Sequence, residues 1–462
     1  MSFWELQADP AAVALVEPSG ARHTYAGLQA SVDEFAEQLP SGKTLGFVLS
    51  RNCVPTVVAY LAALQRRSAV CLLNADLDAE LLGRLVERYS PHWLFAPGDV
   101  VRPLPNYSAR ATKDGRFLHK HMEAGIHPDL ALLLPTSGTT GSPKLVRLSY
   151  TALQANAAAI AEYLAITPSE RAITSLPLHY SYGLSVLNSH LQAGARTLLS
   201  DAPIVQAPFW ALFRSEGATS LAGVPYVYET LRKLRFERMS LPSLRTLTQA
   251  GGRLANEHIE FFQATAMRNQ QRFFVMYGQT EATARMSYVP PEVLANKIGS
   301  IGRPIPGGRF SLGDDGELIY EGPNVMMGYA ESPADLAAGD TQGGRLFTGD
   351  LARPDQDGFF SLIGRKKRFL KLFGLRVNLE EVESELQSRF KVPVACYGSD
   401  DRLQIALEGW SAPEDVLQFL QERYQLNSSA IQVRGDVRLP RQASGKVDYP
   451  RLEEQSTHAG LP

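Results

Sequence analysis

The sequence predicts an α/β protein with a large N-terminal domain, made of stacked α/β subdomains and a β subdomain, and a small α+β C-terminal domain. Apolar runs alternate with helical stretches from residue 10 to about residue 288. Glycine, proline and short apolar runs dominate 289–360, and the composition shifts sharply at 364–376. Alternating strands and helices are typical of a sheet covered by helices. At 462 residues the chain is long enough for two or three domains.

The first elements follow one another in a regular order. We expect helices over the ranges 25–39, 55–65 and 79–89, and strands over the ranges 44–49, 69–73 and 93–96. The polar stretch 103–126 is predicted to be an irregular connection. Apolar runs at 130–134 and 145–148 predict two strands that enclose a polar loop. Ser149 is placed to cap a helix that ends at about Leu164.

The later part of the chain predicts a β region and then a domain boundary. A strand-like run covers 272–276, the range 289–360 is expected to be mainly β, and 378–387 reads as an N-capped helix. We place the boundary near Lys367, which gives an N-terminal domain of residues 1–366 and a C-terminal domain of residues 367–462. The last ~95 residues are enough for a small domain.

Composition excludes several classes of protein. The hydrophobic content of 44% and the charged content of 20% are those of a globular protein. A net charge of −2 gives no global field for nucleic acid or an anionic membrane, and the basic cluster 365–368 is too short for nucleic-acid binding. We find no signal peptide and no run of about 18 apolar residues, so we expect no membrane span. Cys53, Cys71 and Cys396 lack metal-ligand spacing and are expected to be reduced thiols in the cytoplasm.

The loop at 136–144 is the strongest chemical signal. Glycines let successive N–H groups form a concavity for anions, hydroxyls add donors, and a lysine adds a point charge. This is not a Walker A loop, because two residues separate the last glycine from the lysine and a strand follows. A loop that holds the β and γ phosphates of ATP fits better, and a polar hairpin turn is the alternative. The residues concerned are Thr136, Ser137, Gly138, Thr139, Thr140, Gly141 and Lys144.

Two further motifs suit a nucleotide and a metal. Tyr277-Gly278-Gln279-Thr280-Glu281 follows a strand, so its phenol, hydroxyl and carboxylate suit a base, a phosphate and Mg²⁺, with Glu281 as the metal ligand. Asp350 in Thr348-Gly349-Asp350 could accept hydrogen bonds from both ribose hydroxyls, and Arg365 could reach the same ribose or the α-phosphate. The alternatives are a turn with a solvated glutamate and an ordinary Gly-Asp turn.

Two weaker signals concern the reacting groups. Gly445-Lys446 exposes the backbone and offers a mobile ammonium, although a surface lysine is the common explanation for such a pair. His179 lies among aromatic residues, where a lone histidine is usually structural. Four apolar residues could line a pocket for an acid, but core packing explains them equally well: Tyr180, Tyr182, Tyr226 and Met286.

Together these motifs resemble those of the adenylate-forming superfamily, which includes acyl- and aryl-CoA synthetases, adenylation domains that load carrier proteins, and luciferases. The resemblance runs from about residue 20 to residue 452. It rests on the loop 136–144, on Tyr277–Glu281, on Thr348-Gly349-Asp350 and on Gly445-Lys446. It implies a reaction in two steps: a carboxylate attacks the α-phosphate of ATP to give acyl-AMP and pyrophosphate, and a thiol, usually of pantetheine, then displaces AMP.

The resemblance also implies roles for individual residues. It places the loop 136–144 on the β and γ phosphates, Thr280 on the α-phosphate, Glu281 on Mg²⁺, Asp350 with Arg365 on the ribose, and Lys446 between the carboxylate and the α-phosphate. In such enzymes a mobile C-terminal domain rotates about a hinge, here Lys367, and Gly374 lines the thiol tunnel. The residues around adenine and the acid are then Gly251, Gly252 and Tyr277, with His179, Tyr180, Tyr182, Gly183, Tyr226, Gly278 and Met286 on the substrate side.

The sequence departs from the family pattern in ways that bear on the substrate. Most members carry aspartate at the hinge, where this chain has Lys367, as several acyl-CoA ligases do. Domains that activate amino acids place aspartate where this chain has His179, which argues against an α-amino acid. The expected activity is an ATP-dependent ligase that joins a fatty or aromatic carboxylate to CoA. A stand-alone enzyme that loads the phosphopantetheine of an acyl or peptidyl carrier protein is one alternative, and a non-catalytic nucleotide-binding regulator is another.

Overall fold

The computed structural model describes residues 2–98, 107–112, 114–119, 125–135, 144–366, 368–372, 375–399, 402–424, 430–442 and 445–458. It confirms the α/β fold class. The chain divides into two compact units. The first comprises residues 1–298, 302–310 and 320–346, and the second comprises residues 299–301, 311–319 and 347–462. The domain boundary near Lys367 stays a prediction.

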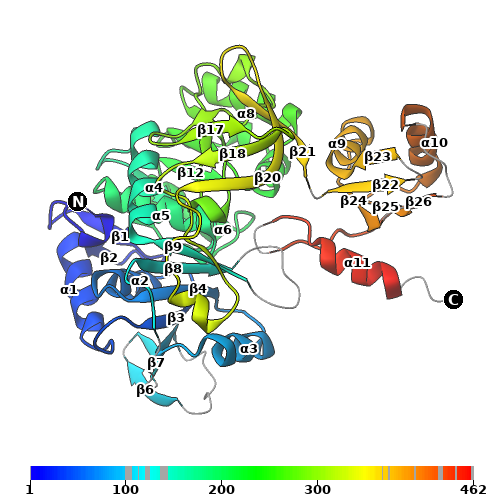
Figure 1. Ribbon diagram of the computed structural model, residues 1–462. Coiled ribbons are helices and arrows are strands. Elements are labelled where there is room, and N and C mark those ends of the chain that lie inside the picture. Colours follow the sequence, from blue (N-terminus) through cyan, green and yellow to red (C-terminus); the bar gives the residue numbers. More distant parts are fainter. Residues whose placement is uncertain are drawn as a thin grey trace. The chain divides into compact units, whose positions relative to one another are not determined.

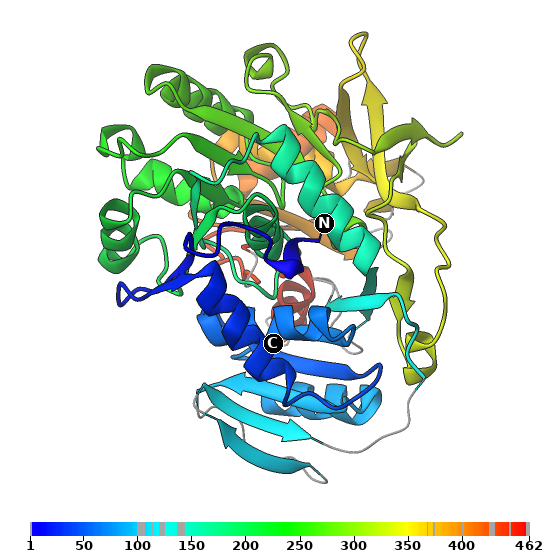
Figure 2. The same ribbon diagram turned by 90° about the vertical axis from the view of Figure 1, so that its left-hand side faces the viewer.

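An eight-stranded sheet in the first unit has the order β19-β9-β8-β4-β3-β5-β7-β6 (Figure 1). Strands β3, β4, β5 and β8 are parallel, and the strands at both ends of the order are antiparallel to their neighbours. Figure 2 shows the β6–β7 hairpin at one edge of this sheet. The strands are β3 (Leu45–Ser50), β4 (Ala69–Asn74), β5 (Trp93–Pro97), β6 (Ser108–Thr112), β7 (Gly115–His119), β8 (Leu130–Pro135), β9 (Leu145–Ser149) and β19 (Gly328–Ala330).

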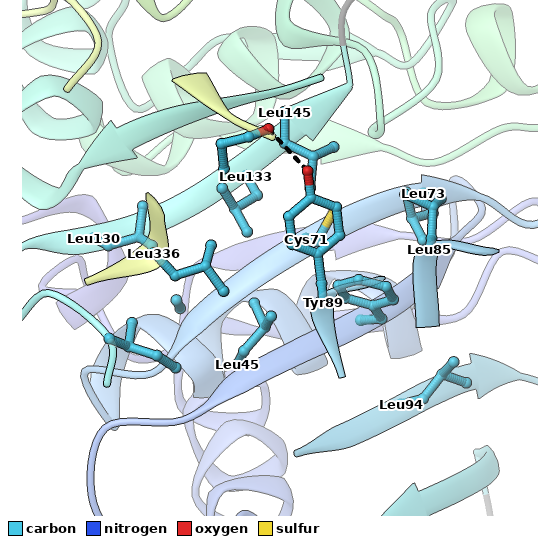
Figure 3. Close-up of a cluster of buried hydrophobic side chains, with 14 of the residues drawn as sticks. Leu45, Cys71, Leu73, Leu85, Tyr89, Leu94, Leu130, Leu133, Leu145 and Leu336 are labelled. Carbon is cyan, nitrogen blue, oxygen red and sulfur yellow. Dashed lines mark hydrogen bonds between the residues drawn. The ribbon is translucent and has the colours of Figure 1, made fainter. Parts of the chain in front are cut away.

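Three helices accompany this sheet: α1 (Tyr25–Ala36), α2 (Val54–Gln65) and α3 (Ala79–Tyr89). Helix α3 begins where the Asp78 carboxylate accepts hydrogen bonds from two backbone N–H groups. Its Leu85 and Tyr89 pack against alternate residues of β3 and β4 in a buried cluster (Figure 3). The Tyr89 hydroxyl donates to the Ala330 carbonyl at 2.8 Å, which ties α3 to the edge strand β19. Truncating one of the buried leucines to alanine would cost about 2–5 kcal/mol.

A nine-stranded sheet, also in the first unit, has the order β16-β15-β14-β13-β12-β10-β11-β1-β2. Its six central strands are parallel, so their carboxyl ends share one edge, where α/β proteins bind ligands. The strands are β1 (Val13–Val16), β2 (Arg22–Thr24), β10 (Arg171–Ile173), β11 (Arg196–Leu198), β12 (Ser220–Gly223), β13 (Thr246–Gln249), β14 (Arg272–Tyr277), β15 (Ser287–Val289) and β16 (Arg303–Pro304). The helices between them are α4 (Tyr150–Tyr163), α5 (Ser181–Gln192), α6 (Ala207–Ser215), α7 (Pro225–Lys233) and α8 (Asn256–Arg268).

The helices that accompany the eight-stranded sheet pack against those that accompany the nine-stranded sheet, as the predicted stack of α/β subdomains requires. Asn188 of α5 donates a hydrogen bond to the Tyr60 hydroxyl of α2 at 3.2 Å. Phe3 lies in the short helix η1 (Phe3–Glu5), and its ring stacks on that of Tyr60. Its N–H donates to Gln154 of α4 at 2.9 Å. The other short 3₁₀ helices are η2 (Phe236–Arg238), η3 (Thr280–Ala282), η4 (Leu294–Asn296) and η5 (Pro333–Leu336).

Antiparallel and mixed β structure dominates the rest of the chain. Strands β20 and β21 are antiparallel and pair in register Asp350↔Arg365. The C-terminal part of the chain has its own apolar core, in which Val382 and Leu386 of α9 pack on β24 and β25. The strands are β17 (Arg309–Leu312), β18 (Glu317–Glu321), β20 (Arg345–Pro354), β21 (Phe360–Arg365), β22 (Phe369–Leu372), β23 (Leu375–Asn378), β24 (Val394–Ser399), β25 (Arg402–Leu407) and β26 (Ile431–Arg434). The helices are α9 (Leu379–Phe390), α10 (Pro413–Tyr424) and α11 (Tyr449–His458).

Most of the predicted elements are confirmed. Helices α1, α2 and α3 and strands β3, β4 and β5 lie where the sequence predicts them, and the Ser149 hydroxyl caps α4. The prediction of an irregular connection over 103–126 was wrong, because strands β6 and β7 lie within it. Strand β7 is held by antiparallel pairing with β5, which is a contact that local sequence does not reveal. The three cysteines are free thiols, as expected.

Candidate active site

The predicted phosphate loop lies between two strands of the eight-stranded sheet. Strands β8 and β9 are antiparallel neighbours that pair up to Pro135↔Leu145, so the residues on the two sides of the loop are neighbours in the sheet. The loop residues Thr136, Ser137, Gly138, Thr139, Thr140 and Gly141 lie outside the described residues. Lys144 is described, and it immediately precedes β9.

Lys144, Tyr329 and Glu281 form a chain of contacts within the first unit. The Lys144 ammonium lies 3.7 Å from the centroid of the Tyr329 ring and 3.0 Å from a Glu331 carboxylate oxygen. The Tyr329 hydroxyl donates to Oε1 of Glu281 at 3.0 Å. Burial, with the nearby Glu281 carboxylate, raises the pKa of Tyr329, so the phenol keeps its proton. The predicted phosphate-binding cation and the predicted metal ligand therefore share one aromatic neighbour.

Strand β19 and the residues after it are held by a buried arginine. Arg147 of β9 is 1% exposed and donates to the backbone carbonyls of Met327, Tyr329, Ala338 and Gly339 at 2.5–3.2 Å. Burial lowers its pKa from the ordinary value, and the carbonyls provide the hydrogen bonds that a buried guanidinium needs. Arg147 thereby fixes the backbone that carries Tyr329.

The motif Tyr277–Glu281 turns sharply at the carboxyl end of β14. A Cβ atom at Gly278 would lie 1.7 Å from the Ala284 carbonyl oxygen, so only glycine allows this close approach. The Thr280 hydroxyl lies 3.1 Å from the Ser181 hydroxyl at the start of α5. Asn324 stabilises the turn in two ways. Its side-chain amide donates to the Ala282 carbonyl at 2.8 Å, and its backbone carbonyl accepts from the Thr283 hydroxyl.

Gly251 and Gly252 follow β13 at the same edge of the sheet. Gly251 has φ +84°, a left-handed conformation that favours glycine, and a Cβ there would lie 2.6 Å from the Tyr180 hydroxyl. The backbone at Gly251 and the phenol of Tyr180 are therefore immediate neighbours. Their roles toward adenine and the acid stay predictions.

His179 directly precedes Tyr180, the N-cap residue of α5. Burial lowers the pKa of His179 to about 4, so the imidazole is neutral at pH 7. Its Nδ1 is buried and has no hydrogen-bond partner among the described residues. A buried ring nitrogen in that state is a candidate to bind a substrate group.

The remaining predicted pocket residues differ in exposure. Tyr182 is 3% exposed, and its hydroxyl donates to the Thr248 carbonyl at 2.8 Å. Met286 is fully buried, whereas Tyr226 is 45% exposed. Gly183 lies in the first turn of α5 and lines a small cavity with Leu176 of the preceding loop. Their assignment to an acid pocket stays a prediction.

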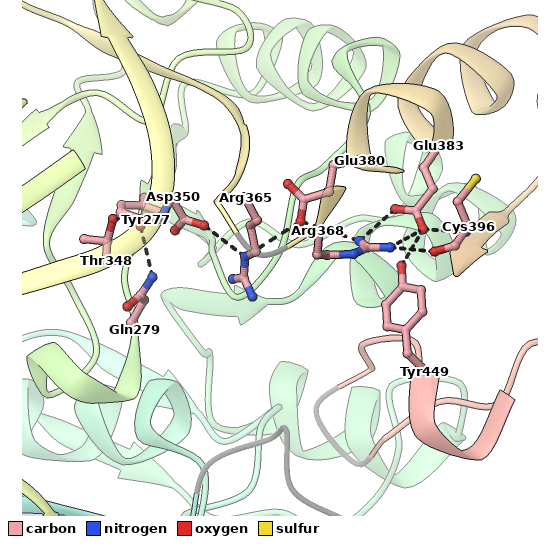
Figure 4. Close-up of polar contacts among 10 residues, drawn as sticks. All are labelled: Tyr277, Gln279, Thr348, Asp350, Arg365, Arg368, Glu380, Glu383, Cys396 and Tyr449. Atoms are coloured by element: carbon pink, nitrogen blue, oxygen red, sulfur yellow. Dashed lines mark hydrogen bonds and ion pairs between the residues drawn. The ribbon is translucent and has the colours of Figure 1, made fainter. Parts of the chain in front are cut away.

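The second unit holds a chain of alternating charges (Figure 4). Arg365 Nε lies 2.9 Å from Oδ1 of the buried Asp350 and 3.7 Å from Glu380 Oε1. Arg368 then pairs with Glu380 at 3.5 Å and with Glu383 at 2.8 Å. The two residues predicted to hold the ribose are thus ion-paired with each other.

The same chain ends in the core of the second unit. Glu383 Oε1 accepts from the Cys396 N–H at 2.6 Å and from the Tyr449 hydroxyl at 2.8 Å. Lys446 lies three residues before Tyr449, and its backbone carbonyl accepts a hydrogen bond from the Gln442 N–H at 2.8 Å. The predicted hinge residue Lys367 and the tunnel residue Gly374 lie outside the described residues.

The described residues contain no cluster of three or more histidine, cysteine, aspartate and glutamate side chains that could hold a metal by themselves. Mg²⁺ usually takes one or two protein carboxylates and completes its shell with substrate phosphates and water. Glu281 presents such a carboxylate, with Oε1 held by Tyr329. Within the described part of the chain, no helix has the length and apolar character needed to cross a membrane.

The fold and these groupings suit a nucleotide-dependent ligase, and comparison with known proteins shows the class. A family model described as AMP-binding enzyme matches residues 3–330. An oxalate–CoA ligase of Arabidopsis thaliana is 31% identical over 92% of this chain and 91% of its own length. A medium-chain fatty-acid–CoA ligase of Escherichia coli K12 is 27% identical over 96% of this chain and 88% of its own length.

A solved structure shares the fold. The o-succinylbenzoate-CoA synthetase of Bacillus subtilis, in complex with its acyl-adenylate intermediate, is 23% identical and covers 98% of both chains with a TM-score of 0.78. The chain belongs to the AMP-binding enzyme family. The predicted class, an AMP-forming acid–thiol ligase, is confirmed.

Sequence reasoning missed four residues of this region: Arg147, Arg285, Asn324 and Tyr329. Arg147 stands in an apolar run, where an arginine suggests an exposed position rather than a buried one. Tyr329 reaches Glu281 only because β19 pairs with β9 across a long stretch of chain. A signal did exist for Arg285, since it lies four residues after Glu281 in a segment that is otherwise uncharged.

Proposed function

We propose that this chain joins a carboxylic acid to the thiol of CoA in two steps that consume ATP. In the first step a carboxylate oxygen attacks the α-phosphorus of ATP, and the bond to pyrophosphate breaks to leave acyl-AMP. In the second step the thiol sulfur attacks the acyl carbon, AMP leaves, and the thiol proton passes to solvent. The contact chain from Lys144 through Tyr329 to Glu281 is the observation that best supports this proposal.

The first step draws on groups of opposite charge. Lys144 would meet the β and γ phosphates, since its ammonium already lies at an anionic carboxylate, that of Glu331, and can exchange it for phosphate oxygens. Glu281 would hold Mg²⁺, which would neutralise part of the negative charge on the phosphates. Thr280 would donate to the α-phosphate. Lys446 would stabilise the charge that grows at the α-phosphate in the transition state.

The remaining residues would orient the nucleotide and the acid. Asp350 would accept from the ribose hydroxyls, with Arg365 held against it by their ion pair. His179 would lie at the acid, where its neutral ring and unpartnered Nδ1 can accept or donate one hydrogen bond. The loop 136–144 would supply backbone N–H groups to the phosphates.

The acceptor and the acid belong to this proposal. The relatives named above act on oxalate in one case and on a medium-chain fatty acid in the other, so they support CoA as acceptor but leave the acid open. A carrier protein would present the same pantetheine thiol as CoA. A cytoplasmic location, where both thiols and ATP are available, remains part of the proposal.

The test is pyrophosphate release by the purified protein over a panel of carboxylates, with CoA present and absent. We expect acid-dependent exchange of pyrophosphate into ATP without CoA, and AMP release that requires CoA. Glu281→Gln should raise the Mg²⁺ concentration needed for half-maximal exchange, since an amide is a poorer ligand for a hard cation, while the exposed Glu292→Gln should not. Exchange without any thioester formation from CoA would point to a carrier protein. The absence of exchange with every acid would refute the proposal.

A further inference from the structure

Arg285 is a buried cation without an anionic partner among the described residues. It is 1% exposed, at the point where the chain leaves the Tyr277–Glu281 turn. Its guanidinium donates to the Tyr163 hydroxyl at 2.9 Å and to the Ser185 hydroxyl at 3.2 Å, and it lies 4.3 Å from the centroid of the Tyr182 ring. Its Nε is buried and lacks an acceptor among the described residues. Arginine keeps its charge in proteins, so a full positive charge resides here.

Arg285 lines a cavity between helices α4 and α5 and the nine-stranded sheet. A second, smaller cavity shares three lining residues with the first, Ile173, Val186 and Ala222, and it extends to Gly183. The two cavities thus adjoin along α5, which contributes Gly183 and Val186 to the smaller one and Val186, Ser189 and His190 to the larger one. The space in the larger one accepts about one or two water molecules, which is about the size of a carboxylate group.

The other polar groups of this cavity do not neutralise Arg285. Glu170 is its one lining carboxylate, and it accepts from the Thr219 hydroxyl and pairs with Arg245 at 3.3 Å. His190 also lines the cavity, but an imidazole carries no negative charge. Its ring N–H donates to the Val186 carbonyl at 2.8 Å. A buried cation that contacts only neutral groups costs free energy in the folded protein.

A purely structural explanation accounts for only part of this arrangement. Arg285 does link α4, α5 and β14, because it also contacts the Met276 sulfur. Neutral groups of similar size could make that link without burying a charge. A guanidinium instead offers planar paired donors that match a carboxylate or sulfonate. Because Arg285 lines the larger cavity, its guanidinium can receive one end of a bound acid.

We propose that Arg285 binds a second anionic group of the substrate, so that the acid activated by this enzyme is a short dicarboxylate or a similar dianion. This inference rests on the proposed function. One carboxylate would react with ATP at the Gly183 end, and the other would enter the cavity and pair with Arg285. The acid is then chosen by charge at its far end rather than by apolar length.

The test compares dicarboxylates with alkanoates of equal carbon number and with the monomethyl esters of the same dicarboxylates. The readout is the ratio of kcat/KM for pyrophosphate release between dianion and monoanion. We expect the wild type to favour a dianion, and Arg285→Met to lower that ratio about 10- to 100-fold by removing a charged hydrogen-bond donor. Arg285→Lys should keep part of the preference. Arg232→Met removes an exposed arginine that lies on the Phe261 ring, and it should leave the ratio unchanged.

Thermal unfolding separates this inference from the proposed function. A dianion that binds the cavity should raise the Tm of the wild type but not that of Arg285→Met, whether or not turnover occurs. Such a shift without pyrophosphate release would refute the ligase proposal and support the anion site. A folded Arg285→Met protein with the wild-type ratio and the wild-type Tm shift would overturn the inference. A wild type that turns over alkanoates and methyl esters as well as dianions would also overturn it.

Discussion

Replacing Tyr329 with phenylalanine removes one oxygen atom from the contact chain between Lys144 and Glu281. The ring stays, so the Lys144 ammonium keeps its place 3.7 Å from the ring centroid, and the β19–β9 pairing is untouched. Only the hydrogen bond of 3.0 Å to Glu281 Oε1 is lost. The variant therefore isolates the effect of holding one oxygen of that carboxylate.

The magnitude follows from the kind of bond. A hydrogen bond to a charged group contributes about 1.5–3 kcal/mol, and removing a partner that orients a metal ligand typically costs 10–100-fold in metal affinity. Tyr329 holds only one of the two Glu281 oxygens, and phosphates would supply further ligands to the metal. We therefore expect a loss of Mg²⁺ affinity at the lower end of this range, about tenfold. The half-saturating Mg²⁺ concentration for pyrophosphate exchange should rise by that factor, with the rate at saturating Mg²⁺ changed by less than about threefold.

The assay is a Mg²⁺ titration of exchange at fixed free ATP for the wild type, Tyr329→Phe and a matched control. Tyr107→Phe is that control, because its hydroxyl donates to the Pro91 carbonyl at 2.6 Å and it belongs to the same unit. Superimposable Mg²⁺ curves for Tyr329→Phe and the wild type would refute the reasoning. A loss of rate that saturating Mg²⁺ does not restore would refute it too, since it would show a defect beyond metal binding.

Three further outcomes are expected. Arg147→Met should lower the free energy of unfolding by about 3–5 kcal/mol in urea titrations, because the buried carbonyls of 327–339 lose their donor; a change below about 1 kcal/mol would show that water replaces it. Lys446→Ala should reduce acyl-AMP formation about 10²–10³-fold and spare transfer from preformed acyl-AMP, and equal losses in both half-reactions would contradict its role. Burial lowers the pKa of His190 from 6.5 to about 4. As the pH drops from 6.5 to 4, this imidazole is therefore protonated in the unfolded chain but not in the folded protein. The free energy of unfolding should fall over that range by up to about 3 kcal/mol. His190→Gln should reduce the slope of that part of the stability–pH curve, to which His179 also contributes, and an unchanged curve would reject the assignment.

The elements that sequence predicts well are those whose signals are local. Helix α3 has the predicted bounds because apolar residues repeat at helical spacing and Asp78 caps its start. The loop before Lys144 and the Tyr277–Glu281 turn are predicted from glycines and hydroxyl side chains that lie within ten residues of one another. The predicted phosphate site draws on residues that lie together in a short segment of the chain, so its signal is visible in the sequence alone.

The features that sequence does not predict depend on distant pairing. The β6 strand, Ser-Ala-Arg-Ala-Thr, has little strand propensity and forms because β7 offers it an edge. Arg147 looks exposed in a linear reading, whereas the carbonyls of 327–339 surround it. Arg285 resembles a solvated charge until the helices that bury it are known. The environment of each arginine is formed by residues about a hundred or more positions away, and strand β6 depends on a sheet edge that exists only after folding.

The pairing of β19 with β9 has a consequence for how the chain acquires its activity. Arg147 and Tyr329, which it joins, are 182 positions apart, so this edge closes only after a long loop has been drawn together. Closing such a loop is slow, and intermediates of large α/β chains acquire helices and local strands first. During refolding, helical content should therefore return well before Glu281 gains its tyrosine neighbour. A nascent chain released before residue 330 would contain Lys144 and Glu281, the predicted phosphate-binding cation and the predicted metal ligand, yet lack the complete strand whose Tyr329 contacts both.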